Sequence, residues 1–151
     1  AALGALLVLL LPLAAGIAFD VNLSQTVHRE VAGRWVEENI EAGSKIAIEH
    51  YAIPFDHTDY SVEDVLRVSD HDLPWYQQEG FDVLVVSDGV WEVLKRAPQA
   101  YADRLAAYDK ATFGSSLLQE FVPNPPGIVV AGYPTVSVYH FAPVRIYQVP
   151  Q

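Results

Sequence analysis

The sequence predicts a mixed α/β domain that follows one membrane-spanning helix. Three observations carry this prediction. Residues 1–19 contain no charged side chain. Beyond residue 25, segments whose apolar residues recur at helical spacing alternate with short apolar runs typical of strands. One of these runs, at 81–87, is almost continuously apolar, which is typical of a strand buried on both faces of a parallel sheet.

The segment 1–19 is long enough to cross a bilayer as one helix. Its nineteen residues span about 28 Å at about 1.5 Å each, against a hydrocarbon core of about 30 Å. A buried helix of a soluble protein is disfavoured, because no face of the segment is polar. We therefore expect the last membrane helix of a longer protein, with 20–25 as a linker and 26–151 as one folded domain.

A secretory signal peptide is the alternative for this segment. Such a peptide carries a basic start and a shorter apolar core. Here the first Lys or Arg is Arg29, and the apolar run is long for a signal. The triplet Gly16-Ile17-Ala18 nevertheless resembles a cleavage site, so the signal interpretation stays open.

The charge of the chain excludes one class of partner and favours one side of the membrane. Nineteen acidic residues against nine Lys and Arg give a formal net charge of −10. Such a surface repels phosphate backbones, so we expect no nucleic-acid partner. The residues after the apolar segment also lack the basic cluster found on the cytoplasmic side of membrane helices, which places the domain on the extracytoplasmic side of the cell membrane. The chain has no Cys, which excludes disulfides and thiolate ligands.

The first expected helix of the domain runs from about Thr26 to Gly43. Ser24 or Thr26 can cap its first turn, and Gly43 can end it. One apolar stripe at helical spacing predicts the helix, formed by Val27, Val31, Trp35, Val36 and Ile40. We expect Trp35 to be a core residue that pins this helix to the sheet. A strand follows at 45–51, where apolar residues alternate.

The middle of the chain is expected to hold one short helix, the buried strand and two further helices. Asp72 can cap the short helix, and Gly80 can end it. Pro98 separates the two helices that follow the buried strand. In chain order, the expected elements are a short strand at 65–68, a helix at 73–78, a strand at 81–87, and helices at 89–96 and 99–113.

The C-terminal third is expected to consist of strands. Pro134 and Pro143 punctuate it, and proline favours edge positions in a sheet. We expect the last strand to close the domain at the sheet edge, against the strand at 117–122 or the one at 135–141. The expected strands are 117–122, 128–131, 135–141 and 144–149. The fold class is therefore a Rossmann-like mixed sheet with a parallel core and an antiparallel C-terminal edge.

The candidate binding residues lie where two predicted strands end. Glu49, His50 and Tyr51 end the first strand, and Ser87 and Asp88 end the buried strand. In open α/β sheets, ligands gather beyond the carboxyl ends of the strands. Carboxylates accept hydrogen bonds from sugar hydroxyls, and an aromatic ring stacks on a sugar, so these residues are typical of a sugar site. A structural interpretation stays open, with Asp88 as a helix cap and Tyr51 in the core.

Two further runs contain residue types that ligate metals. They are Asp56-His57-x-Asp59 and Asp70-His71-Asp72. Both fall in predicted loops, and we interpret them as solvated turn residues, with Asp72 as a cap. We predict no metal or other cofactor in this chain. Phosphate-loop and nucleophile-elbow motifs are absent from the sequence.

An ordered set of short motifs resembles a known family. The set begins with Arg29-x-x-Ala32-x-x-Trp35, Asn39-Ile40, Gly43-Ser44-Lys45-Ile46 and Glu49-x-Tyr51. It continues with 81–85 and Ser87, then 118–123, then 143–147, and it covers most of 26–149. It resembles the post-membrane domain of bacterial polyprenyl-phosphate-sugar-dependent membrane glycosyltransferases. These are GT-C-type enzymes that include protein mannosyltransferase-like and aminoarabinose transferase-like members.

Two features depart from the family pattern. One is an additional hairpin-like stretch at about 132–142, and the other is Asp88, where a second small residue is common. The resemblance implies that the catalytic carboxylate lies upstream, in an extracytoplasmic loop near the N-terminal membrane helices. It also implies that the membrane part handles the polyprenyl-phosphate donor and any divalent metal.

The expected role of this chain is therefore that of an accessory domain without catalytic residues. Its expected partners are the lipid bilayer through 1–19, the upstream transmembrane domain of the same protein, and a glycan or lipid acceptor. The alternative function is a membrane-anchored extracytoplasmic binding or interaction module with no enzyme attached.

Overall fold

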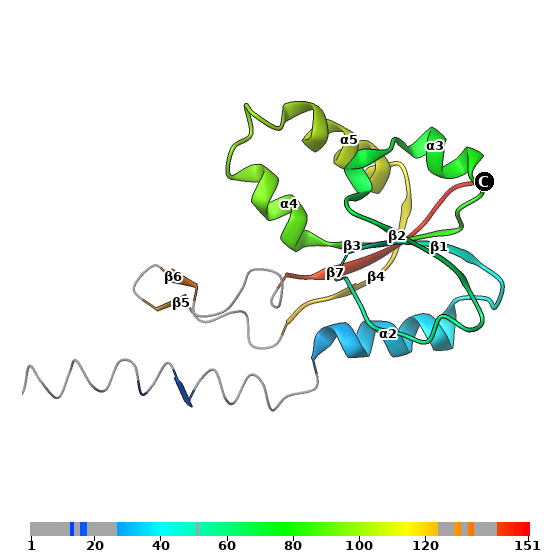
Figure 1. Cartoon of the computed structure of the whole chain (residues 1–151), viewed down its shortest axis with the longest axis horizontal. Coiled ribbons are helices and arrows are strands. Elements are labelled where there is room, and N and C mark those ends of the chain that lie inside the picture. The colour runs from blue at the N-terminus through cyan, green and yellow to red at the C-terminus, as the bar shows by residue number, and fades with distance from the viewer. Residues whose placement is uncertain are drawn as a thin grey trace, which may run out of the picture.

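A five-stranded mixed sheet organises the domain in the computed structural model (Figure 1). The model describes residues 27–50, 52–123 and 142–151, together with 13, 16–17, 129–130 and 133–134. The strand order is β2-β1-β3-β7-β4. The strands are β1 (Lys45–Glu49), β2 (Ser61–Val65), β3 (Val83–Ser87), β4 (Ser116–Phe121) and β7 (Val144–Gln148). Strands β2, β1 and β3 are parallel, whereas β7 runs antiparallel to both β3 and β4, which confirms a mixed α/β sheet.

Helices cover both faces of the sheet. Helix α2 (His28–Asn39) lies on one face. The 3-10 turn η1 (Val68–Asp70) and the helices α3 (Leu73–Gln78), α4 (Asp88–Lys95) and α5 (Ala102–Phe113) lie on the other (Figure 1). Short strands β5 (Val129–Val130) and β6 (Tyr133–Pro134) pair with each other outside the main sheet.

Strand alternation divides the core into two apolar clusters. Val83, Val85 and Ile146 pack with α2, whereas Leu84 and Val86 pack with side chains of α3 and α5. Every residue of β3 is buried, as its apolar run predicts. The sheet therefore has one core layer on each side, and β3 contributes to both.

Residues other than Trp35 make the closest contacts of α2, and Gly33 lies against the segment that follows β1. Ala32, Gly33 and Val36 are the buried residues of this helix. A Cβ on Gly33 would lie 2.0 Å from the Pro54 carbonyl oxygen, so only glycine permits this approach. Trp35 packs against the core, but it is not fully buried as predicted. Its side chain is half-buried and contacts Phe121 edge-on, with ring centroids 6.2 Å apart.

Strand β7 lies inside the sheet, not at its edge as expected. Its expected pairing with the strand at 117–122 is confirmed, because it pairs with β4, but it also pairs with β3 on its other side. Pro143 and Pro150 flank β7 and interrupt neither ladder. The side chains of β7 alternate between the two layers, since Val144 and Ile146 face α2 and Tyr147 faces the opposite layer. The expected strand at 135–141 lies outside the described residues.

Other expected boundaries shifted by a few residues. The short strand expected at 65–68 is β2, four residues earlier, and η1 follows it. Helix α2 begins after Val27 without a side-chain cap, and the expected caps at Ser24 and Thr26 lie outside the described residues. Asp72 caps α3 as predicted, by accepting a hydrogen bond from the Trp75 N–H.

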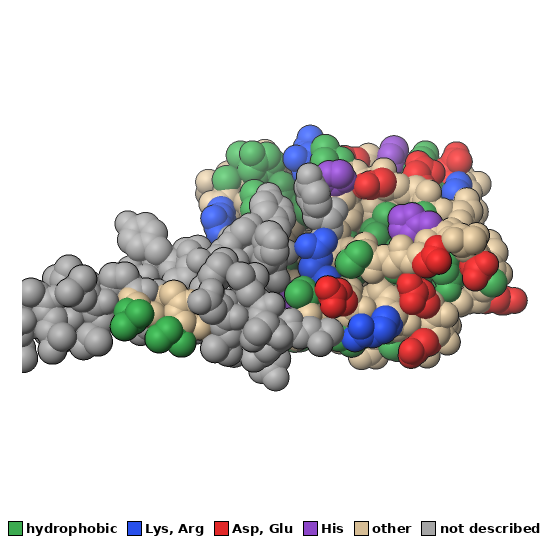
Figure 2. Space-filling view, turned by 60° about the horizontal axis from the view of Figure 1, so that its bottom comes forward, with side chains coloured by type: hydrophobic (Ala, Val, Ile, Leu, Met, Phe, Trp, Pro, Cys, Tyr) green, Lys and Arg blue, Asp and Glu red, His purple; other side chains and the backbone are tan. Residues whose placement is uncertain are grey.

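The expected membrane helix at 1–19 lies outside the described residues except for Leu13, Gly16 and Ile17, and so does the linker at 20–25. Among the helices of the described part of the chain, none has the length and apolar character needed to cross a bilayer. The surface in Figure 2 carries acidic side chains over much of the described face, with basic ones between them.

The interior position of β7 predicts a large effect of truncating its buried side chains. Ile146 is fully buried, so Ile146→Ala should lower the free energy of unfolding by about 2–5 kcal/mol. Leu117→Ala on the neighbouring β4 is the matched control, because that side chain is 52% exposed and should cost much less. Urea denaturation measures both, and equal costs would contradict the interior placement.

Candidate functional site

The carboxyl ends of β1 and β3 form the candidate site. These two strands are parallel neighbours, with Ile48 beside Val85. The connection after β1 passes on the α2 side, where Pro54 meets Gly33, whereas β3 leads into α4 on the opposite side. Ligand sites of open α/β sheets form where successive connections diverge in this way.

Glu49 lies at the centre of this strand end and is fully buried. Its Oε1 accepts a hydrogen bond from the Val68 N–H at 2.9 Å, and its Oε2 accepts one from the Ser87 N–H at 2.9 Å. Burial raises the pKa of Glu49 to about 7, although these two hydrogen bonds favour the charged form. Asp88 and Asp70 add repulsion in the same direction as burial.

Asp88 is the second acidic group of the site and begins α4. Its Oδ1 accepts a hydrogen bond from Arg145 Nη1 at 2.5 Å. Arg145 Nε in turn donates to Glu120 Oε1 at 2.8 Å, so the guanidinium joins α4 to β4 across β7. Burial raises the pKa of Asp88, and Arg145 opposes that rise. Ser87, not Asp88, is the N-cap of α4, and its side chain accepts from the Gly89 N–H.

Tyr108 brings a phenol to the same region from α5. Its side chain is buried, and within the described part of the chain its hydroxyl has no hydrogen-bond partner. Burial raises its pKa well above the usual 10, and the nearby charges of Glu49 and Asp88 act in the same direction. The phenol is therefore protonated at neutral pH, as is expected of a buried tyrosine.

The structure brings together only part of the predicted set. Glu49, Ser87 and Asp88 meet at the strand end as expected. His50 instead turns towards β2, where its Nδ1 lies 3.1 Å from a carboxylate oxygen of Asp64. Tyr51 lies outside the described residues.

Sequence reasoning missed two contributors to the site, Arg145 and Tyr108. Arg145 carried a signal, because it is the one Lys or Arg in the otherwise uncharged run at 135–149. A charge in an alternating strand needs a partner, and Asp88 and Glu120 are the partners here. Tyr108 carried no such signal, because a tyrosine on a helical stripe is typical of an ordinary core residue.

The two metal-like runs have structural roles. Asp56 Oδ1 accepts a hydrogen bond from the Thr58 N–H at 2.9 Å, which is a local turn. Asp72 caps α3, and His71 stacks on Trp75 with ring centroids 3.6 Å apart. No group of three or more His, Asp or Glu that could hold a metal occurs among the described residues.

Comparisons of this chain with family models, with curated proteins and with solved structures found no match. The geometry and the sequence motifs therefore carry the functional argument.

Glu49 should make stability fall as the pH rises. Its pKa of about 7 in the folded state exceeds the ordinary value of 4.5, so the folded protein holds the proton more tightly than the unfolded chain. This contribution is fully present below about pH 4.5 and is lost as the pH rises through about 7. Across that window, the free energy of unfolding of the wild type relative to Glu49→Gln should fall by up to about 1.4 kcal/mol per pH unit.

Urea denaturation of both proteins at several pH values between about 4.5 and 8 measures this difference. Subtracting the Glu49→Gln curve removes the titration of all other groups. Parallel curves for the two proteins would contradict the raised pKa of Glu49.

Proposed function

We propose that this chain is the C-terminal extracytoplasmic domain of an integral-membrane glycosyltransferase. The whole enzyme would move a sugar from a polyprenyl-phosphate donor to an extracytoplasmic acceptor. The observation that carries this proposal is the ordered set of motifs, which runs through most of 26–149. The apolar segment at 1–19 and the acidic domain after it support the same proposal. We also propose that the mixed α/β sheet of this domain is of the Rossmann-like type.

Several residues of the motifs make contacts that stabilise the fold of this domain. Gly43 has a φ of 91°, a conformation that favours glycine, at the turn before β1. Arg29 Nε donates to the Ala52 carbonyl and so ties α2 to the segment after β1. Glu49 joins β1 to η1 and α4 through its two hydrogen bonds. The motifs therefore coincide with contacts that hold the fold together.

The way the charged groups at the strand end are bonded supports a domain without catalytic residues. Both oxygens of Glu49 accept backbone hydrogen bonds, and Arg145 is held between Asp88 and Glu120. A general acid or base must reach the proton that it transfers, at about 2.6–3.2 Å. A fully buried carboxylate occupied by two backbone donors does not meet that need. Within this proposal, the catalytic residues lie upstream, and the domain assists the acceptor.

The proposal predicts that sugar transfer requires the membrane part. We expect the purified chain alone to give no turnover with a polyprenyl-phosphate sugar in proteoliposomes. The whole protein encoded by the parent gene should give turnover, and deletion of 26–151 should reduce it. Turnover by the chain alone, or a parent gene that encodes no further apolar spans, would contradict the proposal.

The second candidate is a membrane-anchored binding or interaction module without catalytic activity. Arg145 fits this function equally well, because its guanidinium pairs with Asp88 and Glu120 of the same domain and leaves no catalytic task to explain. A short basic stretch directly before the apolar segment, with no further spans upstream, would favour the module over the enzyme.

A further inference from the structure

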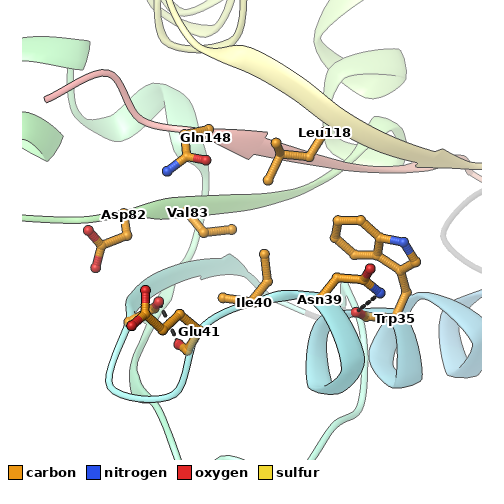
Figure 3. A pocket seen from close by; sticks show the side chains of 9 residues that line it. Trp35, Asn39, Ile40, Glu41, Asp82, Val83, Leu118 and Gln148 are labelled. Atoms are coloured by element: carbon orange, nitrogen blue, oxygen red, sulfur yellow. Dashed lines mark hydrogen bonds between the residues drawn. The ribbon is translucent and has the colours of Figure 1, made fainter.

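A hollow of about 420 Å³ lies at the opposite end of the sheet from the strand-end cluster (Figure 3). It is bounded by the C-terminal part of α2 and by the adjoining parts of β3, β4 and β7. Asp82 directly precedes β3, whereas Ser87 ends that strand, so the hollow and the cluster are separate places. Its volume falls within the range of small-molecule sites, about 300–1,000 Å³.

One wall of the hollow is apolar and aromatic. Trp35 from α2 and Leu118 from β4 line it, and Figure 3 shows Ile40 between them and Asp82. The indole is half-buried, so part of its surface stays accessible. It contacts Phe121 edge-on, with ring centroids 6.2 Å apart, and packs against the buried core cluster on the α2 side of the sheet. These contacts restrict the indole, which lowers the cost of ordering it when a ligand stacks on it.

The other walls are polar. Asn39 lines the hollow from the end of α2, Glu41 from the turn that follows it, and Gln148 from β7. The Asn39 side chain donates to the Trp35 carbonyl at 2.9 Å, which orients its amide. Amide and carboxylate oxygens accept hydrogen bonds from hydroxyl groups. The hollow thus combines an aromatic surface with several hydrogen-bond acceptors, of which the Asn39 amide is held in place.

Charge narrows the class of ligand. Glu41 and Asp82 are both lining residues, and none of the lining residues is Lys or Arg. The Lys45 N–H and the Gln151 side chain donate hydrogen bonds to Asp82, but neither of these groups is charged, so the two carboxylates would repel a phosphate or another anion. A neutral, hydroxyl-rich ring can donate hydrogen bonds to the acceptors while its apolar face lies on the indole.

We propose that this hollow is a binding site for a neutral saccharide unit. The ring face of the sugar packs on Trp35, and its hydroxyls donate to Glu41, Asn39 and Gln148. In the context of the transferase, the site holds a glycan acceptor, and that role rests on the proposed function. Saccharide binding itself does not depend on it.

The test uses the three tryptophans of the chain as reporters. The indole NMR signals of Trp35, Trp75 and Trp91 are followed while the purified chain is titrated with neutral methyl glycosides of glucose, galactose and mannose. Trp75 stacks on His71 and Trp91 stacks on Tyr108, both away from the hollow. We expect a saturable shift of the Trp35 signal alone with at least one glycoside, and a weaker response to glucose 6-phosphate.

A matched pair of variants tests the polar contacts. Glu41→Ala should weaken binding by about tenfold or more, because it removes a charged acceptor. Glu38→Ala is the control, since Glu38 is an exposed glutamate of α2 that does not line the hollow. Because Glu41 is also exposed, both variants should keep the wild-type denaturation midpoint.

Three outcomes would overturn the proposal. They are no saturable shift of Trp35 with any glycoside, equal binding by the two variants, and a stronger response to tetramethylammonium than to every sugar. The last result would identify a cation site, because carboxylates beside an indole also attract cations. If the chain binds sugar but the whole protein transfers none, the saccharide site stands and the proposed transferase function is contradicted. If the whole protein transfers sugar but this hollow binds none, the transferase function stands and the saccharide site is contradicted.

Discussion

The two backbone hydrogen bonds of the Glu49 carboxylate join the segments on which this domain is built. Glu49 ends β1, the Val68 N–H begins η1 after β2, and the Ser87 N–H lies at the cap of α4 after β3. Both donors are buried, and a buried donor without a partner costs about 1–3 kcal/mol. An acidic side chain is therefore accommodated in an apolar interior because it satisfies groups that the turns leave open. The part of the sheet where open α/β folds hold ligands is filled here by a carboxyl group of the protein itself.

The two ends of the sheet differ in character as a result. At the carboxyl end of β3, carboxylates, a guanidinium and a phenol are packed together, and Arg145 forms ion pairs with Asp88 and Glu120. At the other end, polar side chains and an indole surround a hollow that the protein does not fill. Charged groups that bond to one another within the domain stabilise the fold, whereas an unfilled hollow lined by an indole and polar side chains is suited to recognition. The division separates the groups that hold the structure from those available to a partner.

Local sequence patterns predicted most helices and strands, whereas contacts between residues distant in sequence could not be predicted from them. The continuous apolar run of β3 and the Asp72 cap of α3 each depend on neighbours in sequence, and both are confirmed. Glu49, Ser87 and Asp88 were found because ends of parallel strands meet at one edge. The interior place of β7, the partners of Arg145 and the burial of Tyr108 depend on residues far along the chain. The burial of Trp35 was overestimated, because an apolar stripe does not show which side of a helix packs most closely. In α2 that side carries Ala32 and Gly33.

The position of β7 also governs the order in which the domain can assemble. Strand β3 pairs on one side with β1, nearby in sequence, and on the other with β7, so that Val83 lies beside Gln148. Closing so long a loop is slow, because its entropy must be lost before any contact is gained. Until β7 has been synthesised, the backbone groups along one side of β3 have no neighbouring strand to bond with, although every residue of β3 is buried in the folded domain. During that interval the apolar strand β3 has an unpaired edge, which favours aggregation unless other proteins shield it.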